Sequence, residues 1–356
     1  MRIAASLALA CGIAAFAGTV HAQKLQTHQL TFASGYPATF AWTDEEINRF
    51  LPQVNKELEK AGSTHRVKWN VAVGGTLASM PNMLDAMSTG LADVGHVVHL
   101  FEPVRLPLQN VVSAAPFGST DPRIATMALH DLQKTVPAMK KAWEALDLVY
   151  LTSFSFDSYL IVSSQPIKDV RDLDGMKIAA AASNLPWLDG TGAIPVAGTM
   201  GTAYNDIKSG VFTAAINSGM LSIGGKMHEV APYIVRTGFG AINAFDIVVN
   251  KSRWDRLPED VRKALAVAAD DLQEAVITRV ERDTAAAFAA MEKGGAKILD
   301  FTPQQRADWA NRLPNIAQKW AEPLEAKGLP AKEVLNAYLD NLRKAGVELP
   351  RDWSRF

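Results

Sequence analysis

The chain reads D-V-R-D-L-D-G-M-K-I-A-A-A-A-S-N over residues 169–184, G-A-I-P-V over 192–196 and T-A-Y-N-D-I-K-S-G-V-F-T-A-A-I-N-S over 202–218. The first segment predicts a turn leading into a short apolar strand, and the second predicts another short strand. The third predicts a helical turn that ends at Gly210, then a strand that has Asn217 at its end. Strand, helix and strand at this spacing form a βαβ-type unit, whose parallel strands present their carboxyl ends to a ligand crevice.

These segments resemble the solute-binding proteins of TRAP transporters, the tripartite ATP-independent periplasmic uptake systems. The likeness continues through N-K-S-R-W-D-R-L-P-E-D-V-R-K-A-L over residues 250–265 and so covers most of the chain. Each motif is short, and their order and spacing together carry the resemblance. The matched residues are Asp172, Leu173, Gly175, Lys177, Ile178, Gly192, Ala193, Pro195, Val196, Tyr204, Gly210, Val211 and Asn217.

Helix and strand patterns alternate along the chain, which favours an α/β architecture, and 356 residues suffice for two lobes. The resemblance implies a type II periplasmic binding protein, with two α/β lobes joined by crossover strands. We expect lobe I to comprise residues 24–151 plus 239–280, and lobe II to comprise residues 152–238 plus 281–356.

Residues 257–260, L-P-E-D, are a strong helix start, and apolar residues then recur from Val261 to Met291, before Gly294 and Gly295. This pattern predicts one helix of more than roughly thirty residues, about 50 Å long at the usual rise. Such a helix is similar to the one that braces both lobes in TRAP binding proteins. The alternative is two helices broken near residues 282–284.

The N-terminus predicts export to the periplasm. Residues 1–22 have the features of a signal peptide: Arg2, an apolar stretch and the cleavage site V-H-A before Gln23. The single cysteine, Cys11, lies in this segment, so the mature chain would have no disulfide and no cysteine metal site. Acylation of Cys11, which would make a lipoprotein, is the alternative.

Charge and motifs exclude several classes of function. The 36 basic and 37 acidic residues are interspersed, so no basic block indicates nucleic-acid binding, and no second apolar stretch indicates a membrane span. No G-x-S-x-G elbow, P-loop or G-x-G-x-x-G motif after a strand is present, and we expect neither an enzyme nor a cofactor. In H-x-x-H, His96 and His99 point to opposite faces of a strand, which argues against a metal site. His96 then lines the ligand site or is a structural histidine.

Two substitutions distinguish this chain from the family that it resembles. Ala179 stands where the resemblance places the arginine that clamps a substrate carboxylate, and Ser158 stands near the position of the family's other cleft arginine. Thr202 and Thr213 also replace a Glu and an Asp. Small residues cannot replace the bidentate match of an arginine to a carboxylate. Three cations remain as substitutes: Arg236, Arg105 and Lys226.

Aromatic and amide side chains are concentrated in segments that we expect to be loops facing the cleft. Each aromatic residue could instead belong to the core, but together they favour an apolar or aromatic-lined pocket with a few polar groups. Trp42 belongs to the same group of cleft-facing residues. The predicted ligand-binding residues are Tyr36, His96, Phe117, Phe154, Phe156, Tyr159, Asn184, Trp187, Asn217 and Phe245.

The predicted function is therefore capture rather than catalysis. A monomer would bind a small organic solute in an interlobe cleft, close by a hinge motion and deliver the solute to membrane permease subunits. We expect an aromatic or largely apolar solute, with organic acids among the candidates. The alternatives are a binding protein of an ABC-type or sensor-linked system and a secreted enzyme on the same scaffold.

Overall fold

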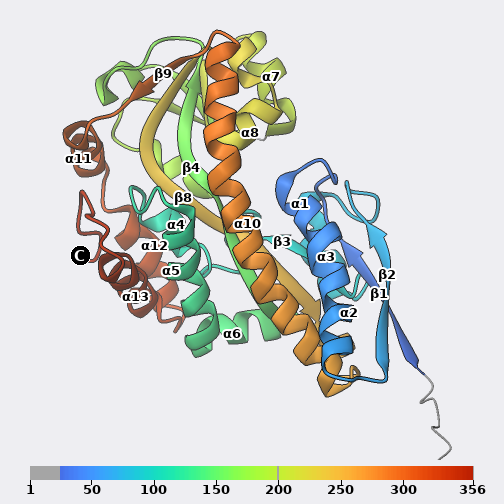
Figure 1. Cartoon of the computed structure of the whole chain (residues 1–356). Coiled ribbons are helices and arrows are strands. Elements are labelled where there is room, and N and C mark those ends of the chain that lie inside the picture. The colour runs from blue at the N-terminus through green and yellow to red at the C-terminus, as the bar shows by residue number, and fades with distance from the viewer. Residues whose placement is uncertain (1–24, 199, 356) are drawn as a thin grey trace, which may run out of the picture.

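The computed structural model describes residues 25–198 and 200–355 (Figure 1). The predicted signal peptide, including Cys11, lies outside these residues. Within them, no helix is both long enough and apolar enough to cross a membrane.

The strands form one nine-stranded sheet in the order β2-β1-β3-β8-β4-β7-β5-β6, with β9 paired to β8. At one end of the sheet, β1 is parallel to both of its neighbours, β2 and β3. At the other end, β5 is parallel to both of its neighbours, β6 and β7. The strands are β1 (Gln26–Ala33), β2 (His65–Ala72), β3 (Val94–Val98), β4 (Leu148–Ser163), β5 (Lys177–Ala180), β6 (Ile194–Ala197), β7 (Ala214–Ser218), β8 (Tyr233–Asn250) and β9 (Lys297–Asp300).

Two long antiparallel strands, β4 and β8, cross the middle of the sheet and join its two halves (Figure 1). Their pairing runs from Leu148 opposite Asn250 to Ser163 opposite Tyr233, with register shifts between Phe154 and Ser158. Phe154, Phe156 and Tyr159 lie in β4, so the expectation that they belong to loops was wrong. Nearly every residue of β4 is buried, so the strand lacks the polar alternation that marks a half-exposed strand.

The predicted βαβ-type unit is confirmed. Strand β5 lies between β6 and β7 and is parallel to both, and α7 connects β6 to β7. Strand β7 begins at Ala214, because the chain is still turning after Gly210, which has φ of 77°. Asn217 lies near the carboxyl end of β7, as predicted.

Helices cover both faces of the sheet (Figure 1). The largest, α10, is one continuous helix of 35 residues that contacts α1 and α2 of one half and α8 of the other. The prediction of an unbroken helix is confirmed. The α-helices are α1 (Ala41–Glu45), α2 (Leu51–Lys60), α3 (Met83–Ser88), α4 (Val111–Ala114), α5 (Pro122–Thr135), α6 (Pro137–Glu144), α7 (Met200–Lys208), α8 (Gly219–Gly224), α9 (Lys251–Trp254), α10 (Glu259–Lys293), α11 (Pro303–Arg312), α12 (Ile316–Glu325) and α13 (Ala331–Lys344).

The C-terminal helices α12 and α13 pack against α4 and α5 (Figure 1). The sequence had assigned α4 and α5 to lobe I, and residues 281–356 to lobe II. The indole of Trp353 also donates to the backbone oxygen of Pro116 at 3.0 Å. The C-terminal segment therefore contacts elements assigned to the first lobe, and the exact lobe boundaries stay a proposal.

Candidate functional site

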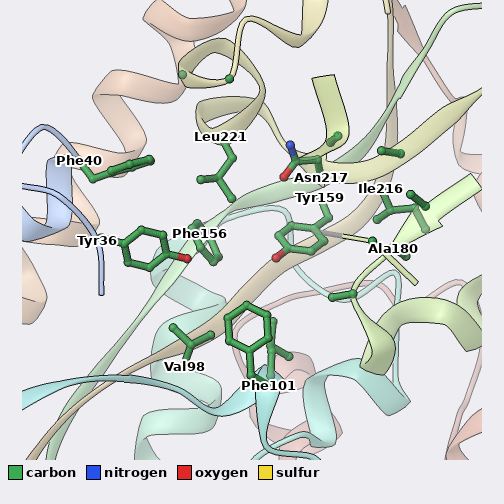
Figure 2. A pocket seen from close by; sticks show the side chains of 18 residues that line it. Tyr36, Phe40, Val98, Phe101, Phe156, Tyr159, Ala180, Ile216, Asn217 and Leu221 are labelled. Carbon is green, nitrogen blue, oxygen red and sulfur yellow. The ribbon is translucent and has the colours of Figure 1, made fainter. Parts of the chain in front are cut away.

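A cavity of about 370 Å³ lies between the two halves of the molecule (Figure 2). This volume is within the usual range of small-molecule sites, about 300–1,000 Å³. All the lining residues in the described part of the chain are uncharged. They are Tyr36, Phe40, Val98, Leu100, Phe101, Phe156, Tyr159, Ala179, Ala180, Ala181, Gly198, Ala203, Ala215, Ile216, Asn217, Leu221, Gly224 and Gly225.

The sheet topology explains why these residues meet. Tyr36 follows the carboxyl end of β1, and Val98 ends β3, which is parallel to β1. In the other half, Ala180 and Asn217 lie at or near the carboxyl ends of the parallel strands β5 and β7. Phe156 comes from the crossover strand β4 between them. The cavity thus lies where ligands bind in open α/β sheets, outside the carboxyl ends of parallel strands.

An aromatic cluster supports one wall of the cavity. The ring of Phe245 lies at its centre, with centroids 4.0 Å from Phe156, 4.9 Å from Trp42 and 5.7 Å from Tyr36. Most of these pairs are edge-to-face or tilted, which are the favoured arrangements of aromatic rings. Because their neighbours hold them, Tyr36 and Phe156 form a preorganised surface.

Behind this cluster lie two buried histidine–carboxylate pairs. Nδ1 of His96 is 2.8 Å from Oε1 of Glu46, and Nδ1 of His99 is 2.6 Å from Oδ2 of Asp246. A π-helical segment, residues 46–50, carries Glu46 into the interior, where burial raises the pKa of its carboxyl group although His96 opposes the shift. The two histidines therefore contact different carboxylates. Across the described residues, no group of three or more potential ligands is placed to hold a metal ion.

The polar atoms that face the cavity are few. In Figure 2, Tyr36 and Tyr159 lie on either side of it, and Asn217 lies near Tyr159. Burial raises the pKa of both phenols well above the usual range, and for Tyr159 the nearby Tyr36 and Asp157 add to the effect. Both hydroxyls therefore stay protonated and can donate hydrogen bonds at any physiological pH.

Asp157, two residues before Tyr159, is a buried carboxylate. Its Oδ2 accepts hydrogen bonds from the backbone N–H groups of Gly219 at 2.7 Å and Met220 at 3.2 Å. Burial nevertheless raises the pKa of the Asp157 carboxyl to about 6, because these bonds, together with Ser218, only partly offset the loss of water.

Of the ten predicted ligand-binding residues, the structure brings four to the cavity wall: Tyr36, Phe156, Tyr159 and Asn217. His96, Phe154 and Phe245 form the layer behind Tyr36. The remaining three, Phe117, Asn184 and Trp187, are buried in the core and do not line the cavity.

Trp187 links the core to α4, β8 and α11. The indole of Trp187 donates to the backbone oxygen of Ser113 at 2.8 Å, and its ring centroid lies 4.9 Å from that of Phe239. Trp309 in turn donates to the backbone oxygen of Trp187 at 2.9 Å. In this conformation, Trp187 packs in the core and does not face the cavity.

Sequence reasoning missed the small and aliphatic part of the wall. Small and aliphatic side chains are equally common in a protein core, so their residue types do not mark a cavity wall. This part of the wall consists of alanines, glycines, Val98, Leu100, Ile216 and Leu221. Ala179 was noted only for its lack of an arginine, and its methyl group is itself part of the wall. The strand ends of the βαβ-type unit were the only available signal for this group.

The three candidate cations do not line this cavity. Arg236 forms two hydrogen bonds of 2.6 Å with Asp300, and Arg105 forms hydrogen bonds of 2.8 and 2.7 Å with Glu102. Lys226 is also absent from the described lining residues. Arg236 instead lines a second cavity of about 630 Å³, between the crossover strands, α10 and α11, together with charged residues such as Glu281.

Comparison with known proteins places the chain in a family. Residues 43–323 match the model of the family described as bacterial extracellular solute-binding protein, family 7. The chain belongs to this family. Among curated relatives, it is 24% identical over 216 residues to the C4-dicarboxylate-binding periplasmic protein DctP of Rhodobacter capsulatus. That match covers 59% of this chain and 64% of the relative.

Solved structures of TRAP solute-binding proteins share the fold. One, from Rhodoferax ferrireducens in complex with copurified benzoate, has a TM-score of 0.78 at 18% identity, covering 90% of this chain and 98% of that one. Another, from an unidentified marine microbe and bound to metahydroxyphenylacetate, has a TM-score of 0.77 at 19% identity, covering 89% and 98%. The predicted two-lobed fold class is thereby confirmed. The family match confirms the prediction of a solute-binding protein instead of an enzyme.

Proposed function

We propose that this chain is the periplasmic solute-binding subunit of a TRAP-type uptake transporter, and that it captures an aromatic or largely apolar solute. The solute would occupy the cavity between the halves, and the closed protein would deliver it to membrane permease subunits. The observation that carries this proposal is the cavity wall, where all the described lining residues are uncharged and most are apolar.

Burial energetics support this choice of solute. A small dicarboxylate would lose the hydration of two charges, which costs several kcal/mol per ion when no opposite charge receives it. At Ala179, where the family resemblance predicts an arginine, the wall offers only a methyl group. An aromatic ring, in contrast, would gain contact with Phe156, Phe101 and Leu221.

The structural relatives bind varied organic acids: some bind galacturonate or pyroglutamate, whereas others bind aromatic acids. The two described above bind benzoate and metahydroxyphenylacetate, both aromatic. Export by the predicted signal peptide and action as a monomer belong to the same proposal.

A thermal-shift screen of the mature protein tests the proposal. The panel should contain aromatic carbonyl compounds, aromatic acids, hexuronates and small dicarboxylates. A ligand at roughly one hundred times its dissociation constant adds about 2.7 kcal/mol of stability, which is readily measured. We expect stabilisation by at least one aromatic compound. Stabilisation by dicarboxylates alone would refute the proposal.

A further inference from the structure

Two phenol hydroxyls face each other across the cavity. Tyr36 follows β1 in one half of the molecule, and Tyr159 belongs to the crossover strand β4. In Figure 2, their oxygen atoms point toward one another, with Phe156 and Phe101 beside the space between them.

We propose that the hydroxyls of Tyr36 and Tyr159 together donate hydrogen bonds to one uncharged oxygen of the solute, such as a ketone, aldehyde or amide carbonyl. This inference rests on the proposed function and narrows its solute class. A carbonyl oxygen has two lone pairs and can accept from both sides at once.

Both hydroxyls are available to donate a hydrogen bond, which supports this role. Within the described residues, neither hydroxyl oxygen makes a hydrogen bond with the protein, although Tyr36 and Tyr159 line the cavity. Both hydroxyls open into the cavity, so an acceptor supplied by the solute can take the place of the water that would otherwise bond them.

The rings are also held in place. Tyr36 contacts Trp42 edge-on at 5.2 Å and Phe245 edge-on at 5.7 Å, and Tyr159 contacts Trp187 edge-on at 6.2 Å. Both donors are therefore fixed before the solute arrives, which reduces the entropy that binding must overcome.

The charge of the surroundings favours a neutral acceptor over a carboxylate. All described wall residues are uncharged, so a bound carboxylate would have no counter-ion. The negative charge of Asp157 helps to raise the pKa of the Tyr159 phenol, and it would also repel a second anion. Two neutral donors then compensate the desolvation of a carbonyl oxygen more completely than that of a full charge.

Calorimetric titration with three probes of similar size tests the inference. Acetophenone has a neutral carbonyl, benzoate has a carboxylate, and toluene has no acceptor. The variants are Tyr36→Phe, Tyr159→Phe and the double variant. Tyr204→Phe is the matched control, since Tyr204 hydrogen-bonds Glu229 and is absent from the described cavity wall.

We expect the unmutated protein to bind acetophenone about tenfold more tightly than toluene or benzoate. Tyr36→Phe and Tyr159→Phe should each weaken acetophenone binding about fivefold or more and leave toluene binding unchanged. The control variant Tyr204→Phe should bind all three probes as tightly as the unmutated protein does. Unchanged toluene binding separates the loss of a donor from damage to the cavity.

Three outcomes would overturn the inference. If benzoate binds as tightly as acetophenone, the preference for a neutral acceptor is wrong. If acetophenone and toluene bind equally and the Tyr→Phe variants change neither, the hydroxyl pair has no role, while the aromatic-binding function stands. If none of the probes binds and only dicarboxylates do, the proposed function falls as well.

Discussion

Phe156 is the residue whose removal most directly tests the aromatic wall. Its ring lines the cavity and packs 4.0 Å from the centroid of Phe245. Phe156→Ala should weaken the binding of an aromatic solute by more than about 1 kcal/mol, because buried aromatic contacts dominate such sites. Calorimetry measures the change, with Val211→Ala as a control on an exposed apolar residue. An unchanged dissociation constant in a folded Phe156→Ala variant would contradict the proposed wall.

Asp157 predicts a specific dependence of stability on pH. Its carboxyl has a pKa of about 6 in the folded protein, above the usual value of about 3.9 for an unfolded aspartate. Between these values the folded state binds more protons than the unfolded state. The free energy of unfolding from this group therefore falls as pH rises from about 4 to about 6 and is level above that.

Asp157→Asn should remove this dependence while keeping an oxygen that accepts from Gly219 and Met220. Denaturant unfolding at several pH values measures the difference between variant and parent. That difference should grow by on the order of 2–3 kcal/mol in favour of the variant between pH 4 and 6. A constant difference over this interval would show that Asp157 titrates normally.

At the scale of elements, α10 must be continuous to contact both halves. Ala286 lies on its exposed side, in the interior of the helix, and α10 continues to Lys293. Ala286→Pro should lower the free energy of unfolding by about 3 kcal/mol or more, and Ala286→Gly by about 1 kcal/mol. If the helix broke near residues 282–284, proline would lie in the first turn of a new helix, where it is tolerated. Equal effects of proline and glycine would therefore indicate a broken helix.

The same elements show what the sequence could predict. Helix α10 and the βαβ-type unit were predictable because their apolar spacing, their glycine stop signals and the turn residues agree. The crossover strand β4 was underestimated because burial on both faces removes the period-two alternation. Aromatic residues gave only partial guidance: Phe156 lines the cavity, whereas Trp187 fills the core, and the two positions differ only in tertiary packing.

At the scale of the whole molecule, the cavity has walls from both halves, so solute binding should favour a compact state. The two crossover strands, β4 and β8, join the halves. Strand β4 has register shifts near Ser155, and β8 contains Gly238 and Gly240, both with positive φ. Small-angle scattering of the mature protein should show a smaller radius of gyration with a bound aromatic solute than without it. An identical radius in both states would contradict hinge closure.

An uncharged cavity should select aromatic or largely apolar solutes over dicarboxylates. The most direct measurement is calorimetric titration of the mature, unmutated protein with succinate and with the aromatic compound that stabilises it most in the thermal-shift screen. We predict measurable binding of the aromatic compound and none, or at least a hundredfold weaker binding, of succinate, a difference of about 2.7 kcal/mol or more. Succinate binding as tight as that of the aromatic compound would contradict it.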